Sequence, residues 1–330
     1  MKTLLVTGGA GYIGSHAVRA LLEQRHKVVV VDNLSRGHLQ AVDAGAVFVE
    51  LDLGDSASLE KLFGQYQFDA VIHFAGSLEV GLSMKEPALF FRNNCVNGLN
   101  LLEAMRKSGV QNIIFSSSAA VYGNPKMVPI REDALLEPTN FYGTTKRIFE
   151  ELLQDYDRMF GIKSVALRYF NAAGSDSAGD IGYDQTPVTH LIPRILKTAL
   201  GKFEQFEIHG TDYDTADGTC IRDYIHVVDL VEAHLLALDF LLKEGRSEIF
   251  NLGNGKGYSV HEVVQKALIV SGKTIKIQEG PRRAGDPAVL VADSTKAEKI
   301  LGWKPRLSSL EAMIESAWKW HSSHPDGYKN

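Results

Sequence analysis

The chain has 330 residues, of which 45% are hydrophobic and 23% are charged, and its formal net charge at pH 7 is −5. This length and composition can build a sizeable hydrophobic core, in one large unit or two fused ones. The negative balance, with no basic cluster to offset it, argues against a nucleic-acid partner.

Cysteine content and apolar runs indicate where the protein works. Cys95 and Cys220 lie in no CxxC spacing and beside no ligand-type histidine, so we expect buried thiols, no disulfide framework and no metal site. The apolar run at the start is too short for a signal peptide, and Asp239 interrupts the most apolar later run. These features predict a cytoplasmic protein that makes no membrane contact.

The first fourteen residues, MKTLLVTGGAGYIG, join a short apolar strand to a glycine-rich turn. Residues 4–6 have the continuous hydrophobicity of a strand buried on both faces of a parallel sheet. Gly8, Gly11 and Gly14 follow, and an amphipathic run begins at Tyr12. Such a turn lets the backbone approach a pyrophosphate, and the helix start offers free N–H groups, so the stretch predicts a dinucleotide site.

A second apolar strand, residues 27–31, ends at Asp32, eighteen positions after Gly14. An acidic side chain there can accept hydrogen bonds from both hydroxyls of an adenosine ribose, and it would repel a 2′-phosphate. The fingerprint therefore predicts NAD. Arg36 is the nearby residue that keeps NADP as the alternative.

Strand and helix signals alternate through the first half of the chain. This alternation predicts a Rossmann-type doubly wound parallel sheet of six or seven strands. Thr139 or Asn140 is placed to cap the last helix of the series. Further strands are expected at 47–50, 69–74, 112–116 and 164–169, and helices at 56–63, 87–107 and 142–160.

The regular alternation fades after Asn171. We expect an NAD-binding domain at 1–171 and a smaller α+β substrate-binding domain at 172–330. Residues 225–252 again have the pattern of a helix followed by a strand, and this segment could return to the first domain.

Tyr142 and Lys146 are four residues apart on a predicted helix, and so one turn from each other on the same face. A tyrosine phenol has a pKa near 10, which a nearby ammonium and an oxidised nicotinamide would lower. On spacing alone the pair is also an ordinary helix surface. Its context favours catalysis, because the strand 112–116 ends in three serines, and a hydroxyl there could hold a substrate oxygen against Tyr142.

Several motifs resemble one known family. TGGAGYIG, the segment SSSAAVYG at 116–123 and the Tyr142-x-x-x-Lys146 pair are similar to those of the extended short-chain dehydrogenases/reductases. HFAG at 73–76, RYFNAAG at 168–174, DGTCIRDYIHVVDL at 217–230, NLGNGKGYSV at 251–260 and RRAGDPAVLVAD at 282–293 narrow the resemblance. In this order they resemble the UDP-glucose 4-epimerases over nearly the whole chain. The resemblance implies an isomerase that interconverts UDP-glucose and UDP-galactose by transient oxidation at the sugar's fourth carbon, with tightly held NAD.

The same resemblance implies roles for individual residues. Tyr142 takes the proton from the sugar's 4-hydroxyl, Ser118 hydrogen-bonds the reacting oxygen, and Lys146 tunes Tyr142 and holds the nicotinamide ribose. The implied cofactor-binding residues are Gly8, Gly11, Tyr12, Ile13, Gly14, Asp32, Asn33, Asp52, Leu53, Phe74, Ala75, Gly76, Asn94, Ser116, Tyr142, Lys146 and Phe170. The implied substrate-binding residues are Ser118, Tyr142, Asn171, Leu191, His209, Arg222, Arg283, Asp286 and Leu290.

Charge supports one of these assignments independently of the resemblance. Arg222 and Arg283 would bind the diphosphate, for which guanidinium groups are well suited. Either arginine taken alone would be interpreted as a solvated surface charge.

Four positions depart from the best-known bacterial pattern. Leu78 replaces a lysine near the sugar, His190 an asparagine, and His209 an aromatic ring that stacks on uracil, although a lone histidine is as readily structural. Leu290 replaces a bulky tyrosine that limits the pocket. These differences leave the expected chemistry intact, but they do not fix which sugar the enzyme accepts. A UDP-N-acetylglucosamine 4-epimerase or a dual-specificity enzyme is therefore the alternative.

Two other functions compete with epimerisation. A nucleotide-sugar 4,6-dehydratase places an Asp-Glu pair beside its active-site hydroxyl residue, whereas this chain has Ala119 and Ala120, which cannot transfer protons. A non-catalytic dinucleotide sensor would have no reason to keep Tyr142, Lys146 and Ser118 together. Both are disfavoured.

The resemblance and two long predicted helices together suggest a homodimer. Leu102 and Met105 on the first helix, with Ile148 and Leu152 on the second, could form a four-helix contact between two subunits. The alternative is that these side chains face the sheet.

Overall fold

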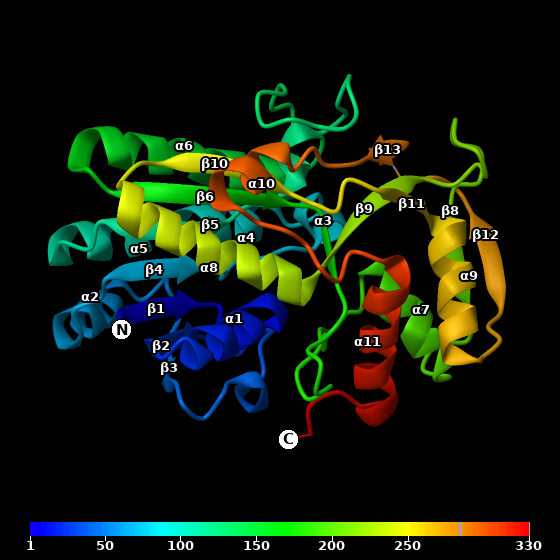
Figure 1. Cartoon of the computed structure of the whole chain (residues 1–330), viewed down its shortest axis with the longest axis horizontal. Coiled ribbons are helices and arrows are strands. Elements are labelled where there is room, and N and C mark those ends of the chain that lie inside the picture. The colour runs from blue at the N-terminus through cyan, green and yellow to red at the C-terminus, as the bar shows by residue number, and fades with distance from the viewer. Residues whose placement is uncertain (284–285, 330) are drawn as a thin grey trace.

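The computed structural model describes residues 1–283 and 286–329. Within these ranges, seven parallel strands form one sheet in the order β10-β6-β5-β4-β1-β2-β3 (Figure 1). The strand order reverses at β1, so the predicted doubly wound sheet is confirmed. The strands are β1 (Thr3–Thr7), β2 (Lys27–Asp32), β3 (Val47–Glu50), β4 (Ala70–His73), β5 (Asn112–Ser116), β6 (Lys163–Tyr169) and β10 (Glu248–Leu252).

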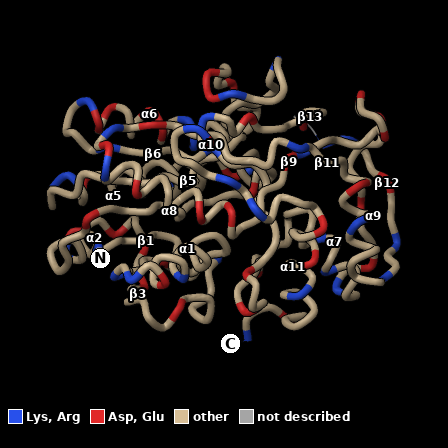
Figure 2. The backbone as a smooth tube through the Cα atoms, viewed as in Figure 1, with Lys and Arg blue, Asp and Glu red and all other residues tan. Residues whose placement is uncertain are grey.

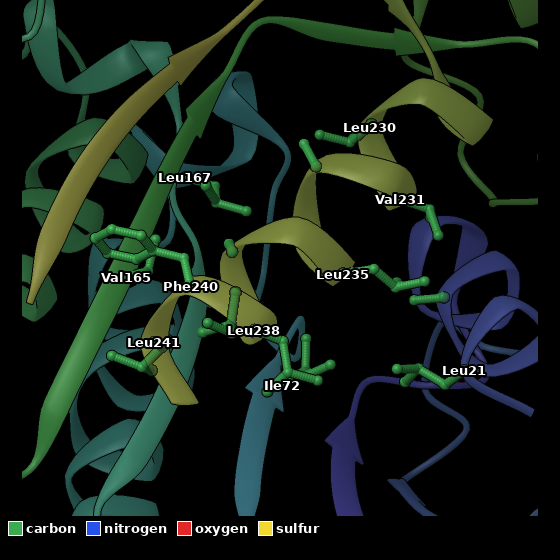
Figure 3. Packing of buried hydrophobic residues seen from close by; sticks show 14 of the residues in the cluster. Leu21, Ile72, Val165, Leu167, Leu230, Val231, Leu235, Leu238, Phe240 and Leu241 are labelled. Carbon is green, nitrogen blue, oxygen red and sulfur yellow. The ribbon is translucent and has the colours of Figure 1, made fainter. Parts of the chain in front are cut away.

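Helices α1 (Tyr12–Glu23) and α8 (Val227–Glu244) pack against one face of the sheet. Figure 3 shows α8 directing Leu230, Val231, Leu235, Leu238 and Leu241 toward Leu21 of α1, Ile72 of β4 and two residues of β6. The short helix α10 (Thr295–Leu301) packs beside α8 and β10. Residues 227–252 therefore supply a helix and an edge strand to the sheet begun by the first half of the chain.

The opposite face is covered by α2 (Ser56–Gln65), α5 (Asn97–Ser108) and α6 (Phe141–Phe160). The single helix expected at 87–107 is wrong in detail, because α4 (Pro87–Phe91) is separated from α5 by a π-helical turn, Arg92–Val96. The chain is helical on both sides of this turn, so the sequence is typical of one continuous helix and does not mark the π-helical turn. Such turns are frequent at functional sites.

Two of the four apolar residues that suggested a dimer contact face the core, whereas Ile148 and Leu152 are partly exposed. Leu102 and Met105 are fully buried in the core against the sheet, so they cannot contact a partner. The large exposed apolar side chains of this region are Leu89, Phe91, Val96 and Leu99.

The remainder of the chain forms a smaller α+β part beside the sheet (Figure 1). Strand β9 (Ile221–His226) pairs with β7 (Asn171–Ala173), β11 (Gly257–Ser259) and β13 (Val289–Leu290), and β8 (Phe206–His209) pairs with β12 (Ile277–Gly280). Helices α7 (Leu191–Ala199), α9 (Val260–Ser271) and α11 (Leu310–Ser323) pack around them in a separate core.

Charge is spread over both parts. Figure 2 shows basic and acidic residues interspersed along the chain. Among the described residues, no helix combines the length and the hydrophobicity needed to span a membrane.

Candidate active site

The glycine turn brings β1, the start of α1 and the loop after β4 into close contact. Gly8 has a φ of +73°, and a Cβ added there would lie 2.6 Å from the main-chain nitrogen of Ala75. A Cβ on Gly14 would lie 2.2 Å from the carbonyl oxygen of Gly8. Within the described ranges no side chain caps α1 at Gly11, so its first N–H groups remain available to an anion.

The two residues that follow Gly11 lie on different sides of the turn. Tyr12 donates a hydrogen bond from its hydroxyl to the carbonyl of Gly174, 2.6 Å away, which links the turn to the segment after β7. Ile13 packs against the hydrophobic core between the sheet and helices α1 and α8. Only the main chain of these residues is therefore free to bind a phosphate.

Asp32 is buried beside this turn. Its carboxylate accepts hydrogen bonds from the main-chain N–H groups of Ala10, at 3.0 Å, and Leu34, at 2.9 Å. Burial raises its pKa, and these donors act in the opposite direction. Asn33 donates to Asp52 at 2.6 Å, so the residues expected around the adenosine lie together.

Two further contacts involve the residues expected around the adenine. Asn97 donates to Asp52 at 3.3 Å, and Asn100 donates to the carbonyl of the buried residue Leu53 at 3.0 Å. No motif or spacing in the sequence marked these two asparagines, which α5 brings over the end of β3.

Arg36 interacts with neither Asp32 nor its hydrogen-bonding partners. Its guanidinium forms an ion pair with Glu79 at 2.7 Å and donates to the carbonyl of Thr186. These contacts connect the loop after β2 to the loop after β4 and to the smaller part of the chain. The arginine is thus engaged by groups other than Asp32.

The loop after β4 carries the next expected cofactor residues. Phe74 and Ala75 donate their N–H groups to the carbonyl of Thr7, at 2.9 and 3.1 Å. A Cβ on Gly76 would lie 3.0 Å from Oδ1 of Asn94. Phe170, on the far side of the site, donates its N–H to a carbonyl of β10 at 3.3 Å.

Asn94 occupies the π-helical turn, and its side chain joins two elements. It accepts from the N–H of Ser77 at 2.7 Å and donates to the Thr145 hydroxyl at 2.9 Å. Since Thr145 precedes Lys146, the widened turn couples the loop after β4 to the helix that carries the candidate catalytic pair.

Tyr142 and Lys146 project from the first turns of α6. Asn140 caps this helix, accepting from the N–H of Gly143 at 2.8 Å. The Lys146 ammonium donates to the carbonyl of Ser116 at 2.9 Å and lies 5.8 Å from the centre of the Tyr142 ring. The Ser118 side chain lies close enough to the Tyr142 hydroxyl to oppose the rise of its pKa. The three expected catalytic residues are thus brought together at the end of β5.

Burial controls the electrostatics of this cluster. It raises the pKa of Tyr142 well above its ordinary value, and the neighbouring Tyr169 adds to this effect, whereas the side chain of Ser118 opposes it. Burial lowers the pKa of Lys146 to about 8, against the opposing influence of Cys95 and Glu150. The protein alone therefore favours a neutral phenol beside a lysine that is still mostly charged at pH 7.

Tyr169 belongs to the same cluster and was not predicted individually. Its hydroxyl lies 2.9 Å from Oγ of Ser116. The only sequence signal for it was its membership of the RYFNAAG segment.

Arg222 is the most informative residue on the substrate side. Its side chain is 13% exposed, and Nη1 donates to the carbonyl of Ile221 at 2.9 Å. Nη2 lies 3.5 Å from Asp286 but is buried without a hydrogen-bond partner among the described residues. A buried, unsatisfied guanidinium N–H is costly, and a phosphate oxygen would satisfy it.

His209 and Arg283 lie in the same region. The pKa of His209 is lowered by burial and by the nearby positive charge of Arg283, so the histidine is neutral at pH 7. Its Nδ1 is 3.5 Å from Glu207, and its side chain is 31% exposed. It is thus accessible, as a uracil contact requires.

Leu290 lies on β13, next to the strand that carries Arg222. It is paired in register with Arg222 and packs against the cluster that contains Ala119, Tyr122 and Phe170. Ala119 directly follows Ser118. Leu290 therefore links the strand of Arg222 to the cluster that follows Ser118.

Asn171, Leu191 and His190 make mainly structural contacts. Asn171 donates from Nδ2 to a carbonyl of β9 at 2.8 Å, and Leu191 begins α7. His190 is hydrogen-bonded to the hydroxyl of Tyr183 at 3.0 Å, and burial lowers its pKa to about 4.

Comparison with known proteins agrees with this geometry. Residues 4–253 match the model of a family described as the NAD dependent epimerase/dehydratase family. The chain belongs to this family.

Epimerase/dehydratase relatives match almost the whole chain. The UDP-glucose 4-epimerase of Halalkalibacterium halodurans is 50% identical, over 98% of this chain and 97% of that protein. The crystal structure of the Brucella ovis UDP-glucose 4-epimerase in complex with NAD is 46% identical with a TM-score of 0.94, covering 96% of this chain and 98% of that one. The Bifidobacterium longum enzyme in complex with NAD+ and UDP is 40% identical with a TM-score of 0.94, covering 99% and 100%.

The residues of this epimerase/dehydratase fit NAD. The uncapped start of α1 suits the pyrophosphate, and the buried carboxylate of Asp32 suits the adenosine ribose. NAD is the cofactor of the family.

Proposed function

We propose that the protein interconverts UDP-glucose and UDP-galactose, with NAD as its resident cofactor. The observation that carries this proposal is the buried Nη2 of Arg222, which has no hydrogen-bond partner among the described residues and belongs to a residue paired in register with Leu290. A diphosphate on Arg222 would leave the attached sugar on the side of Tyr142 and Ser118.

Two parts of the chain would share the ligands. The sheet formed by 1–171, completed by 227–252, would bind NAD, and the rest of 172–330 would bind the UDP-sugar. Gly8, Gly11 and the main chain of 12–14 would hold the pyrophosphate. Asp32 and Asn33 would hold the adenosine ribose, Asp52 and Leu53 the adenine, and Phe74, Ala75, Gly76, Asn94, Ser116, Lys146 and Phe170 the nicotinamide side.

NAD held by these residues would supply the acceptor and donor of the hydride at the sugar's fourth carbon. Tyr142 would accept the proton of the 4-hydroxyl and later give it back, with Ser118 hydrogen-bonded to the same oxygen. Burial disfavours the phenolate of Tyr142, so the positive charge of Lys146 is needed to favour it. A proton acceptor whose own pKa is high also returns the proton readily.

The substrate-side residues would hold one end of the ligand only. Arg222 and Arg283 would bind the diphosphate, while His209 and Leu191 would contact the nucleotide and Asn171, Asp286 and Leu290 the remainder. With UDP fixed in this way, the oxidised sugar could turn about its bond to the diphosphate and present its other face.

A cytoplasmic homodimer is part of the proposal. Its support is the set of exposed apolar residues on α4 and the following turns, Leu89, Phe91, Val96 and Leu99. Light scattering at micromolar concentration tests it, and a monomeric mass would contradict it.

The proposed activity is tested with the purified protein. Denaturation should release NAD into the supernatant, and UDP-galactose should be converted to UDP-glucose without added cofactor. The proposal would be wrong if no NAD appeared in the supernatant. It would also be wrong if UDP-galactose were not converted when NAD was supplied.

A further inference from the structure

Ser117, the middle serine of the three that end β5, has a different partner from its neighbours. It is completely buried, and its hydroxyl donates to Oε1 of Glu150 at 2.5 Å. Its N–H donates to the carbonyl of Leu167 at 2.9 Å. Thus Ser116 contacts Lys146, Ser118 contacts Tyr142, and the residue between them is anchored to the helix that carries both.

Glu150 lies on α6, one turn after Lys146 and two turns after Tyr142. Arg168 of β6 donates to both of its carboxylate oxygens, from Nε at 3.0 Å and from Nη2 at 2.5 Å. Both side chains of the pair are 2% exposed. The ion pair therefore joins α6 to the sheet directly behind the three serines.

The other end of Arg168 reaches the far side of the Ser118 turn. Its Nη1 donates to the hydroxyl of Tyr122 at 2.9 Å, and that hydroxyl donates to Asn251 of β10 at 2.6 Å. Tyr122 ends the 3₁₀ turn Ala119–Tyr122, which Ser118 caps. Ser118 is thus held by the Glu150 network on both sides.

A second contact fixes α6 against this turn. A Cβ on Gly143 would lie 2.4 Å from the carbonyl oxygen of Ala120, so the first turn of the helix packs directly on the 3₁₀ turn. The Tyr142 and Lys146 side chains project from α6 close to the two fixed points, Gly143 and Glu150.

We propose that Glu150, paired with Arg168 and acting through the Ser117 hydroxyl, is a positioning residue that sets the separation between the three serines and the Tyr142–Lys146 pair. The inference rests on the epimerase activity proposed above. A buried ion pair loses the hydration of two charges, and apolar residues of similar volume often stabilise a core equally well. Stability alone therefore does not explain why this ion pair lies next to the turn that Ser118 caps.

Replacement of Ser117 tests the connection while leaving the ion pair intact. Displacing a reacting group by a fraction of an ångström to 1 Å lowers rates by roughly 10- to 100-fold, so Ser117→Ala should lower kcat for UDP-galactose by that factor. KM and the NAD content should stay at wild-type values, because neither ligand contacts Ser117. Ser117→Thr, which keeps a hydroxyl, should recover most of the lost kcat.

A matched control separates positioning from general destabilisation. Asp229 is a buried carboxylate of α8 that accepts from the N–H groups of Arg306, at 3.1 Å, and Leu307, at 2.8 Å. Asp229→Asn should lower Tm but leave kcat unchanged. Wild-type turnover in the same assay tests the proposed function by itself, so failure of that function is distinguished from failure of this inference.

The double variant Glu150→Met/Arg168→Met tests the network without leaving an unpaired buried charge. It should remain folded by circular dichroism and retain NAD, and kcat should fall 10- to 100-fold. A folded, NAD-loaded double variant with wild-type kcat would overturn the inference, as would Ser117→Ala with wild-type kcat. Loss of NAD from Ser117→Ala in parallel with kcat would also overturn it, since the hydroxyl would then support the fold of the cofactor site.

Discussion

Lys146 donates its hydrogen bond to the main-chain carbonyl of Ser116, and its ammonium lies 5.8 Å from the centre of the Tyr142 ring. Among the described residues the lysine makes no hydrogen bond with the tyrosine. In the proposed mechanism Lys146 would therefore act on Tyr142 through its charge across a buried space, where such interactions are strong. The proposed catalytic pair should then be sensitive to the protonation state of the lysine.

Removing the phenol of Tyr142 should abolish most activity while leaving the site intact. Tyr142→Phe keeps the ring, and general acid–base catalysis typically contributes about 10²- to 10⁴-fold, so kcat should fall by that order or more. NAD released on denaturation should match the wild type, which serves as the control for folding. Turnover near that of the wild type would mean that the proton goes to another group.

The rate should fall at alkaline pH as Lys146 loses its charge. Burial lowers its pKa to about 8, so the ammonium is present below that pH and is lost above it. The pKa of Tyr142 is raised by burial, so the tyrosine does not ionise on its own to compensate. The kcat profile of the wild type should therefore show an alkaline limb near pH 8.

Lys146→Arg supplies the control for this profile. A guanidinium keeps its charge throughout the accessible range, so the limb should disappear, whatever the absolute rate of the variant. A limb at the same pH in both proteins would assign it to another group.

Arg222 should contribute chiefly to binding of the sugar nucleotide. Its buried Nη2 lacks a hydrogen-bond partner among the described residues, and hydrogen bonds to charged groups contribute about 1.5–3 kcal/mol. Arg222→Met should accordingly raise KM for UDP-galactose by roughly 10- to 100-fold and leave the NAD content unchanged. Arg222→Lys should recover part of the affinity, because it restores charge without the bidentate geometry. Equal KM values for the Arg222→Met variant and the wild type would remove Arg222 from the diphosphate site.

Arg36 is expected to have little influence on the choice between NAD and NADP. It is engaged by Glu79 and Thr186, and a half-exposed ion pair of this kind contributes about 0–1 kcal/mol. Arg36→Ala should speed NAD release no more than about fivefold, measured by fluorescence after dilution. A change from NAD to NADP in the cofactor recovered from Arg36→Ala or Glu79→Gln would contradict this assignment.

The sequence predicted those parts of the fold that depend on residues adjacent to one another along the chain. The strand, turn and helix at 1–14 need only their own order of apolar and glycine residues, and the Asn140 cap needs only the residues after it. The Ser117–Glu150 bond joins residues 33 positions apart, and no periodic pattern encodes it. The interpretation of Leu102 and Met105 as dimer contacts failed for a related reason, since a helix with apolar residues on one face does not reveal which neighbour covers that face.

The sugar specificity depends on Leu290 as a pocket wall. A 2-acetamido group is several heavy atoms larger than a hydroxyl, so accepting it requires space beside the sugar's second carbon. Leu290 is paired with Arg222 and packs against the cluster of Ala119, Val121, Tyr122 and Ile130, and a tyrosine at this position would add a ring to that wall. Overlap in a packed wall costs roughly 1–3 kcal/mol, which corresponds to about ten- to two-hundredfold discrimination.

The wild type should therefore show a secondary activity on UDP-N-acetylgalactosamine, at a rate comparable to or lower than that on UDP-galactose. Leu290→Tyr should suppress this activity selectively by the factor given above, and Leu290→Met, which conserves volume, should spare both sugars. The alternative is that the segment around Pro287 lies inward and closes the gap that leucine leaves. Assays of the two substrates side by side decide between these two cases. Leu290 would not determine the sugar specificity if the wild type had no activity on the acetamido sugar. The same conclusion would follow if Leu290→Tyr lost activity equally on both sugars.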